Sequence, residues 1–247
     1  MSKTDTIFAE PLGQVQDFQF DDKVVEVFPD MIKRSVPGYT TIINGIGEIA
    51  QRFVKDGSQI YDLGCSLGAA SLSIRQAVNA KSCSIIAIDN SSAMVERCRL
   101  IQSGYNFETS IEVIEADIND IEINNASMVI LNFTLQFLPR GQRKPLIEKI
   151  YRGLNPGGCL VLSEKLSLQH DELDQHIIDL HHDFKKSNGY SDMEIAQKRA
   201  ALENVLLPDS REKHYQRFAQ AGFSQFDTWF QHYNFASFLA VKEALVR

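Results

Sequence analysis

Short apolar runs alternate with amphipathic segments through the middle of the chain. Between these runs apolar residues recur at helical spacing, as they do at Ala70, Ile74, Ala77 and Val78. We interpret the runs as five strands, over residues 59–63, 84–89, 111–117, 127–133 and 159–165. Nearly continuous apolar strands that alternate with helices predict an α/β fold, in which helices cover both faces of a parallel sheet.

Segments with a different pattern flank this core. We expect a helical N-terminal cap over residues 1–54, in which residues 1 to about 20 form a mobile polar arm and a Pro-Gly turn at Ser35–Tyr39 separates two helices. Residues 168–215 are polar with helical periodicity, which predicts a helical insertion. Two aromatic-rich runs from Phe226 to Val241, on either side of Asn234, predict a terminal hairpin. We expect one domain over residues 1–247.

Polar residues cluster where the predicted strands end. They are Asp62 to Gly68, Asp89, Asp117 and Asn132. Ligands of open α/β sheets bind at the carboxyl ends of the strands, so these residues are expected to converge on one site. Taken singly, the glycines could be turn residues and Asp89 a helix-capping acid, but the four strand ends together favour a ligand site.

The turn after the first strand, YDLGCSLG at residues 61–68, distinguishes between nucleotide ligands. A dinucleotide fingerprint needs G-x-G-x-x-G, whereas here Gly64 and Gly68 have Ser66 between them. Asp62 would also repel a pyrophosphate. S-adenosylmethionine fits better, because it has no phosphate and its sulfonium and ammonium attract carboxylates. Asp89 is then expected at the ribose hydroxyls, and Asp117 and Ile118 at the adenine.

Net charge and cysteine content further limit the class of protein to which the chain can belong. The 247-residue chain has a net charge of -7, which argues against direct nucleic-acid binding. We interpret its densest basic cluster, PRGQRK at residues 139–144, as a solvated helix start. The four cysteines lack C-x-x-C spacing, and no apolar run is long enough for a membrane span or a signal peptide. We therefore expect a cytoplasmic protein with reduced thiols and no membrane association.

A group of histidines and acids could suggest a metal site. His176, Asp179, His181, His182 and Asp183 lie close together in the sequence, but they do not form an H-E-x-x-H arrangement. We interpret them as a solvated helix face and expect no metal.

At family level the motifs resemble those of class I S-adenosylmethionine-dependent methyltransferases. YDLGCSLG resembles their first motif, D/E-x-G-x-G-x-G, with Ser66 at the middle glycine. AIDNS, EADI and LNPGG resemble the motifs that follow. The resemblance implies a Rossmann-like fold with a seven-stranded, mostly parallel sheet, a helical N-terminal segment and a helical insertion before the last two strands.

A narrower resemblance extends from Phe28 to Leu206. The strings FPDMIKRSVPGY, DLGCSLGAA, AIDNSSAMVERCR, NFTLQFL, SEK and QKRAALENVL are similar, in this order, to the carboxy-S-adenosylmethionine synthase family. The resemblance implies that S-adenosylmethionine and prephenate are converted to carboxy-S-adenosylmethionine and phenylpyruvate. It also implies a homodimer that supplies the carboxymethyl donor for tRNA wobble uridine, with the tRNA carboxymethyltransferase as a candidate partner.

The resemblance also implies which residues contact the ligand. Arg199 matches the arginine that meets the new carboxylate, and it could reach across from the other subunit. Without the resemblance, Arg199 would be interpreted as a surface ion-pair residue and Tyr39 as a turn aromatic. The matching positions are Tyr39, Gly64, Cys65, Ser66, Asp89, Asn90, Asp117, Ile118, Asn132 and Arg199.

The implied mechanism needs little acid–base chemistry from the protein. Prephenate loses CO2 and hydroxide as its ring becomes aromatic, the hydroxide removes a methyl proton made acidic by the sulfonium, and the methyl carbon captures CO2. Proximity and exclusion of water are then the main contributions of the protein. Two alternatives stay open: a methyltransferase for a small molecule, and a non-catalytic carrier of a sulfonium nucleotide.

Overall fold

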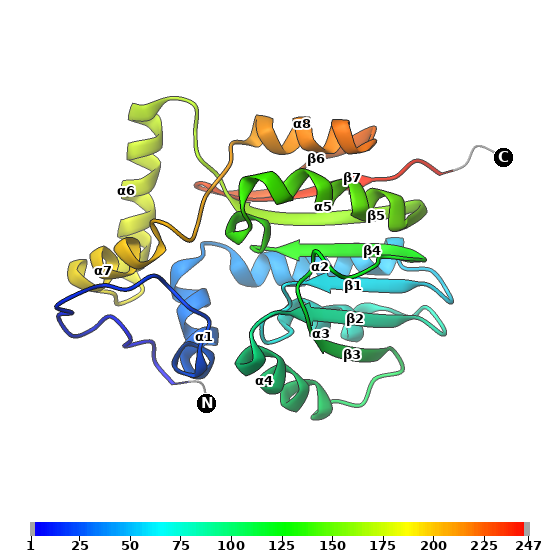
Figure 1. Ribbon diagram of the computed structural model, residues 1–247, viewed down its shortest axis with the longest axis horizontal. Helices are drawn as coiled ribbons and strands as arrows, with labels where there is room; N and C mark the ends of the chain where they lie inside the picture. The colour runs from blue at the N-terminus through cyan, green and yellow to red at the C-terminus, as the bar shows by residue number, and fades with distance from the viewer. Residues whose placement is uncertain (1–2, 245–247) are drawn as a thin grey trace.

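The fold is built on one mixed sheet of seven strands in the order β3-β2-β1-β4-β5-β7-β6 (Figure 1). The structure is a computed structural model that describes residues 3–244. Among the described strands β7 alone runs against the others, since it pairs antiparallel with both β5 and β6. The predicted mostly parallel seven-stranded sheet is confirmed. The strands are β1 (Gln59–Leu63), β2 (Ser84–Asp89), β3 (Ser110–Glu115), β4 (Ala126–Asn132), β5 (Leu154–Lys165), β6 (Gln225–His232) and β7 (Phe235–Val241).

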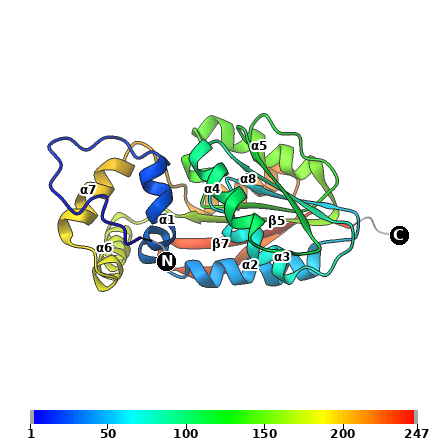
Figure 2. The same ribbon diagram turned by 90° about the horizontal axis from the view of Figure 1, so that it is seen from below.

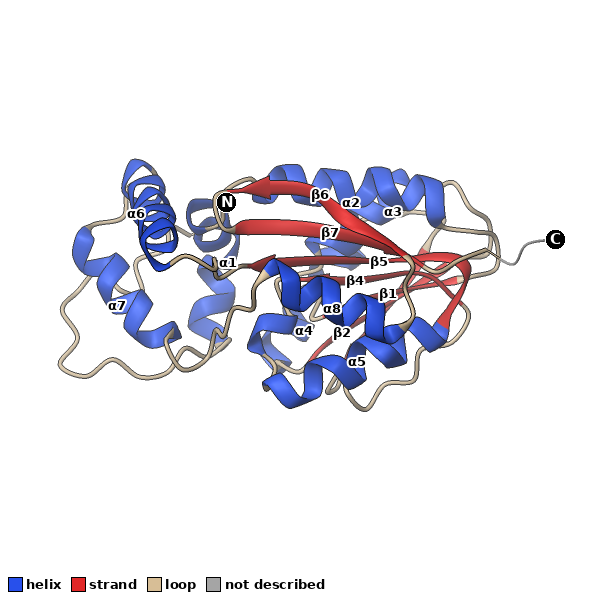
Figure 3. Cartoon of the chain, turned by 90° about the horizontal axis from the view of Figure 1, so that it is seen from above, coloured by secondary structure: helices blue, strands red, loops and turns tan. Residues whose placement is uncertain are grey.

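Helices cover both faces of the sheet. Helices α2 and α3 lie on one face and α5 and α8 on the other, as Figures 2 and 3 show from opposite sides. Helix α4 shares a buried cluster with α2 and α3, through Val95 and Cys98. The helices are α1 (Asp22–Ser35), α2 (Tyr39–Phe53), α3 (Ala69–Ala77), α4 (Ser92–Ser103), α5 (Arg140–Gly153), α6 (Asp171–Ser187), α7 (Asp192–Leu202) and α8 (Arg211–Ala221), with a 3-10 turn, η1 (Leu135–Phe137).

The local sequence sets most of these boundaries. Ser91 caps α4 by accepting a hydrogen bond from the Met94 amide, and Gly104 follows the last turn. Strand β3 ends at Glu115, two residues earlier than expected. Strand β5 begins at Leu154, so the segment NPGG belongs to the strand although it does end the preceding helix at Gly153.

The N-terminal arm and helices α1, α6 and α7 gather beyond the carboxyl ends of the parallel strands (Figure 1). Residues 3–21 contain no helix, as expected for the arm, yet they are anchored to the rest of the chain. The Asp5 side chain is 2% exposed, and the Phe18 amide donates to the carbonyl of Ala201 at 2.9 Å. The expected mobile arm is therefore packed along α7.

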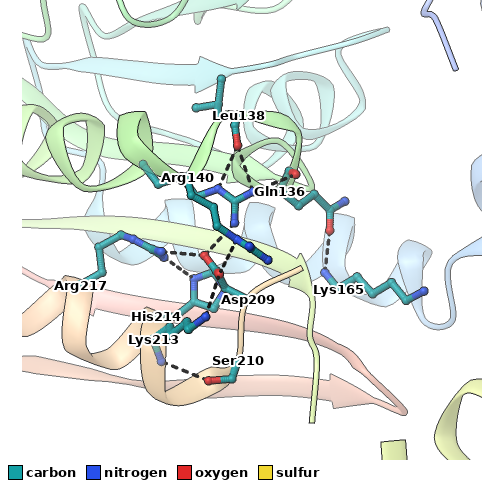
Figure 4. Close-up of polar contacts among 10 residues, drawn as sticks. Gln136, Leu138, Arg140, Lys165, Asp209, Ser210, Lys213, His214 and Arg217 are labelled. Carbon is teal, nitrogen blue, oxygen red and sulfur yellow. Dashed lines mark hydrogen bonds and ion pairs between the residues drawn. The ribbon is translucent and has the colours of Figure 1, made fainter. Parts of the chain in front are cut away.

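The helical insertion is shorter than predicted. Helices α6 and α7 lie within residues 168–215, but residues 203–210 contain no helix, and α8 starts at Arg211 and continues to Ala221. The interruption contains Asp209, whose buried carboxylate receives hydrogen bonds from Arg143 and Arg217, each at 2.7 Å (Figure 4). This chain segment is held by ion pairs instead of by a helix.

Residues 139–144 begin α5 and are exposed except for Arg143, so the predicted solvated basic helix start is confirmed apart from this one residue. Arg143 is fully buried, and its guanidinium contacts Asp209 and the carbonyls of Gln136 and Leu138. Burial would raise the pKa of Asp209, but hydrogen bonds from the two arginines outweigh it and lower that pKa. Because separating Arg143 from Asp209 would leave a buried charge uncompensated, the guanidinium is held in place. Its hydrogen bonds to the carbonyls of Gln136 and Leu138 then fix the loop after β4.

No helix within residues 3–244 has the length and apolar character that crossing a bilayer requires. In the same range, His, Cys, Asp and Glu side chains form no group of three or more that could hold a metal ion. All four cysteines are buried, and none forms a disulfide.

Candidate functional site

A cavity of about 270 Å³ lies where the strand ends meet α1, α6, α7 and the arm. Strands β1 and β4 are neighbours at the point where the strand order reverses, which is the position expected for a ligand in this type of sheet. Nine of the ten predicted residues line this cavity: Tyr39, Gly64, Cys65, Ser66, Asp89, Asn90, Asp117, Ile118 and Asn132. The predicted convergence of the strand ends is confirmed.

The loop after β1 has a backbone that suits close contact with a ligand. Gly64 and Gly68 have φ angles of 77° and 75°, and Ser66, at the middle position of the motif, has a φ of 48°. A Cβ on Gly64 would lie 2.4 Å from Cγ2 of Thr134, on the loop after β4. Gly64 is therefore needed both for its left-handed conformation and for the approach of the two loops.

Asp89 links this loop to the start of α4. One carboxylate oxygen accepts from the Ser66 amide at 2.8 Å, and the other accepts from the Ser91 amide at 3.0 Å. Burial raises the pKa of Asp89, although the amides of Ser91, Ser66 and Asn90 act to lower it. Asp89 thus both stabilises the loop after β1 and lines the cavity.

Two polar side chains, Asp62 near the end of β1 and Asn132 at the end of β4, line the cavity. Asp62 is buried beside Ser71, whose hydroxyl donates to it at 2.6 Å, and burial raises the pKa of Asp62 to about 6. The Oδ1 atom of Asn132 is buried and has no hydrogen-bond partner among residues 3–244. Buried acceptors are normally paired, so this pair of side chains favours a ligand that donates hydrogen bonds or is cationic.

The remaining predicted ligand contacts differ in burial. Tyr39 begins α2, its ring centroid is 6.4 Å from that of Phe133, and burial raises the pKa of its phenol. Cys65 and Ile118 are buried, whereas Asn90 and Asp117 are exposed at the edge of the cavity. Asp117 follows β3 and accepts from the Asn119 amide at 2.8 Å.

Cationic side chains line the other half of the cavity, and the sequence interpretation missed them. They are Lys165 at the end of β5, Lys185 of α6 and Lys198 of α7. The strand-end rule that identified Asn132 also applies to Lys165, because β5 is the parallel neighbour of β4. Lys185 and Lys198 lie in the insertion, whose position over the sheet no local pattern indicates.

His181 contradicts the prediction of a solvated histidine face. Its ring is 3% exposed, lines the cavity and donates from Nε2 to the carbonyl of Ser35 at 2.8 Å. Burial lowers the pKa of His181 to about 2, so the ring is neutral. His176, Asp179 and Asp183 of the same helix are exposed, as predicted.

Arg199 differs from the other nine predicted residues. It does not line the cavity of this chain, and its side chain is exposed. Lys198 and Leu202, four residues apart on α7, line the cavity, whereas Arg199 is rotated about the helix axis by about 100° from Lys198 and by about 60° from Leu202. Its charge still acts on Lys165 and Lys185, whose pKa values it helps to lower.

Known proteins share this arrangement. Residues 60–158 match the family model described as "Methyltransferase domain". A carboxy-S-adenosyl-L-methionine synthase of Vibrio campbellii is 58% identical over 241 residues, covering 98% of both chains. One of Vibrio cholerae serotype O1 is 59% identical over 242 residues with the same coverage. The chain belongs to the carboxy-S-adenosyl-L-methionine synthase family. This synthase is therefore a transferase, and the family predicted from the motifs is confirmed.

A solved structure supports the fold of the synthase. Human N-acetylserotonin methyltransferase, in complex with S-adenosyl-L-methionine, superposes with a TM-score of 0.58 at 17% identity. The match covers 90% of this chain and 56% of that one. The Rossmann-like methyltransferase fold is confirmed. The cytoplasmic location, the lack of nucleic-acid contact, and docking with a tRNA-modifying enzyme stay predictions.

The close approach at Gly64 gives a test of the loop. We expect Gly64→Ala to weaken S-adenosylmethionine binding by about tenfold or more, because the added methyl must displace Thr134. Gly57→Ala is the matched control, since Gly57 has a φ of 68° and open space around it. Strain in the left-handed region, about 1–2 kcal/mol, is common to both variants. Isothermal titration that shows equal losses in the two variants would contradict a role for the approach itself.

Proposed function

We propose that this enzyme makes carboxy-S-adenosyl-L-methionine from S-adenosyl-L-methionine and prephenate, with release of phenylpyruvate. The product would supply the carboxymethyl donor for modification of a tRNA wobble uridine. The observation that supports this proposal is the polarity of one cavity, which has carboxylates at the strand ends and ammonium groups on the opposite side. A cationic sulfonium compound and an anionic acid suit these two halves.

The acidic half suits S-adenosyl-L-methionine. Asp89 would accept hydrogen bonds from the ribose hydroxyls, and Asp117 and Ile118 would contact the adenine, since all three line the cavity at neighbouring strand ends. Asp62 and the unpaired Oδ1 of Asn132 would attract the ammonium and the sulfonium. Such groups favour a cation because a buried carboxylate gains most from an opposite charge nearby.

The proposed reaction is balanced without an added oxidant or cofactor. Prephenate loses CO2 and hydroxide and becomes phenylpyruvate, hydroxide takes one proton from the S-methyl group to form water, and the methyl carbon bonds to CO2. His181 is a poor base for this proton, because its pKa is far below neutrality and its Nε2 is engaged with Ser35. The contributions of the protein are orientation of the two substrates and exclusion of water.

Phenylalanine rings that line the cavity would help to exclude water from it. Phe20 on the arm contacts the rings of Phe28 and Phe137 edge-on, at centroid distances of 6.3 Å and 5.4 Å. All three rings line the cavity, and so does Phe18. The arm thus closes the side of the site that would otherwise face solvent.

A labelling experiment separates the proposed reaction from its alternatives. The enzyme is incubated with S-adenosyl-L-methionine and prephenate that has ¹³C in its ring carboxylate, and the nucleotides are analysed by mass spectrometry. We expect the cofactor to gain one labelled CO2 over many turnovers. Release of S-adenosylhomocysteine would indicate an ordinary methyltransferase instead. Binding of the carboxylated nucleotide without any turnover would indicate a carrier.

A homodimer is the second part of the proposal. Leu173 and Leu180, two turns apart on α6, and Met193 on α7, the helix that carries Arg199, are exposed large apolar side chains. An apolar face of this kind favours a protein contact, and a second copy of the chain would bring an exposed Arg199 to the cavity of its partner. There its guanidinium would bind the new carboxylate with charge assistance.

Sedimentation equilibrium tests the dimer. We expect the wild-type protein to sediment as a dimer and Leu180→Glu as a monomer, since a buried charge without a partner opposes association. Leu100→Glu is the control, because Leu100 is 65% exposed on α4, outside the α6–α7 face. A monomeric wild-type protein, or a Leu180→Glu variant that remains dimeric, would contradict this interface.

A further inference from the structure

Two ammonium groups at the basic half of the cavity have no ion-pair partner among residues 3–244, although the Asp174 carboxylate acts on one of them, Lys165, from a greater distance. Lys165 ends β5 and Lys185 lies on α6, and both side chains line the cavity. Figure 4 shows the Lys165 side chain extending away from the Asp209 cluster, while its backbone amide donates to Oε1 of Gln136 at 2.9 Å. Across residues 3–244, neither ammonium has a hydrogen-bond or ion-pair partner.

Lys198, by contrast, has partners within the protein for its ammonium group. Its ammonium donates to the hydroxyl of Ser35 at 3.0 Å and lies 3.5 Å from the Asp5 carboxylate, which the arm brings to it. The interactions of Lys198 are thus internal to the protein. Lys165 and Lys185 lie beside the same cavity, yet no acid of this kind is placed against them.

The environment of these two groups disfavours their charged form. Burial lowers the pKa of Lys185 to about 7, and the neighbouring charges of Lys165, Lys198 and Arg199 act in the same direction. Burial and Arg199 likewise lower the pKa of Lys165, and they outweigh the Asp174 carboxylate, which acts to raise it. Buried like charges are unfavourable unless an opposite charge joins them, so an anion that binds here relieves an existing penalty.

We propose that Lys165 and Lys185 form the subsite for the carboxylates of the second substrate, a cyclic dicarboxylic acid. This inference rests on the proposed function, which requires a dianion next to the sulfonium nucleotide. Two ammonium groups match two negative charges, and ion pairs formed inside a closed cavity are stronger than those in water. The pair is therefore expected to determine specificity for a dianionic partner over a neutral one.

The neighbouring side chains suit the ring of such an acid. Phe235 lies beside the neutral His181 ring, at a centroid distance of 4.8 Å, and Val36 and Leu202 complete an apolar wall of the cavity. None of these side chains competes with the lysines for a carboxylate. A ring on the apolar wall with its carboxylates on the lysines would satisfy both halves of an amphipathic substrate.

The test measures binding of each substrate separately in four proteins: wild type, Lys185→Met, Lys185→Arg and Lys186→Met. Lys186 is the matched control, because it is the next residue of α6, is exposed and pairs with Asp192 at the surface. Titration calorimetry gives the dissociation constant of S-adenosylmethionine for the free protein. It then gives that of prephenate for the complex with S-adenosylmethionine, at a temperature and time short enough to limit turnover.

We expect Lys185→Met to weaken prephenate binding by about tenfold or more, as the loss of a charge-assisted contact implies, with S-adenosylmethionine binding within about twofold of wild type. Lys185→Arg keeps the charge and should retain most of the prephenate affinity, and Lys186→Met should behave as wild type. Retained S-adenosylmethionine binding also shows that each variant is folded. Lys165→Met should repeat the result of Lys185→Met.

Two results would overturn the inference. One is prephenate binding that does not depend on Lys185 or Lys165. The other is an equal loss for both ligands, which would place the lysines at the carboxylate of S-adenosylmethionine. Saturable, lysine-dependent prephenate binding without a carboxylated product would contradict the proposed function but support the subsite. A carboxylated product with lysine-independent binding would do the reverse.

Discussion

Charge of opposite sign at the two ends of a single cavity is the constraint on which the rest of this structure depends. At the strand ends Asp62 and Asp89 are buried with raised pKa values, and across the cavity Lys165 and Lys185 are half-buried with lowered ones. Each end is unfavourable in the absence of a ligand, because ionised groups lose their hydration. A cation at one end and an anion at the other relieve both penalties and hold two reactants side by side.

The surrounding fold keeps these charges apart and in place. Arg143, fixed by Asp209, donates to the carbonyl of Gln136, and the Gln136 side chain accepts from the amide of Lys165. A buried ion pair thus sets the position of the strand end from which Lys165 projects. On the other side of the cavity, Asp5 of the arm pairs with Lys198 and so connects α7 to the N-terminal arm. Lys165 and Lys185 have no such ion pair among residues 3–244.

The fold and the acidic half of the site could be predicted from the sequence, because both follow from local signals. Apolar strands separated by amphipathic helices indicate the sheet, and polar residues after the strands indicate the site, so Asp62, Asp89 and Asn132 were found together. The basic half could not be found in this way. Lys185 and His181 belong to a polar helix whose cavity-facing side is defined only by packing across α1, and Arg143 resembles a solvated residue until its partner, 66 residues later, is known.

A crystal structure of the enzyme with bound S-adenosylmethionine tests the opposed charges most directly. The account predicts the ribose hydroxyls on Asp89, the adenine beside Ile118, and the S-methyl group directed into the half of the cavity that Lys165 and Lys185 line. A nucleotide bound in the opposite direction, with its adenine among the lysines or its methyl group turned away from them, would contradict the account.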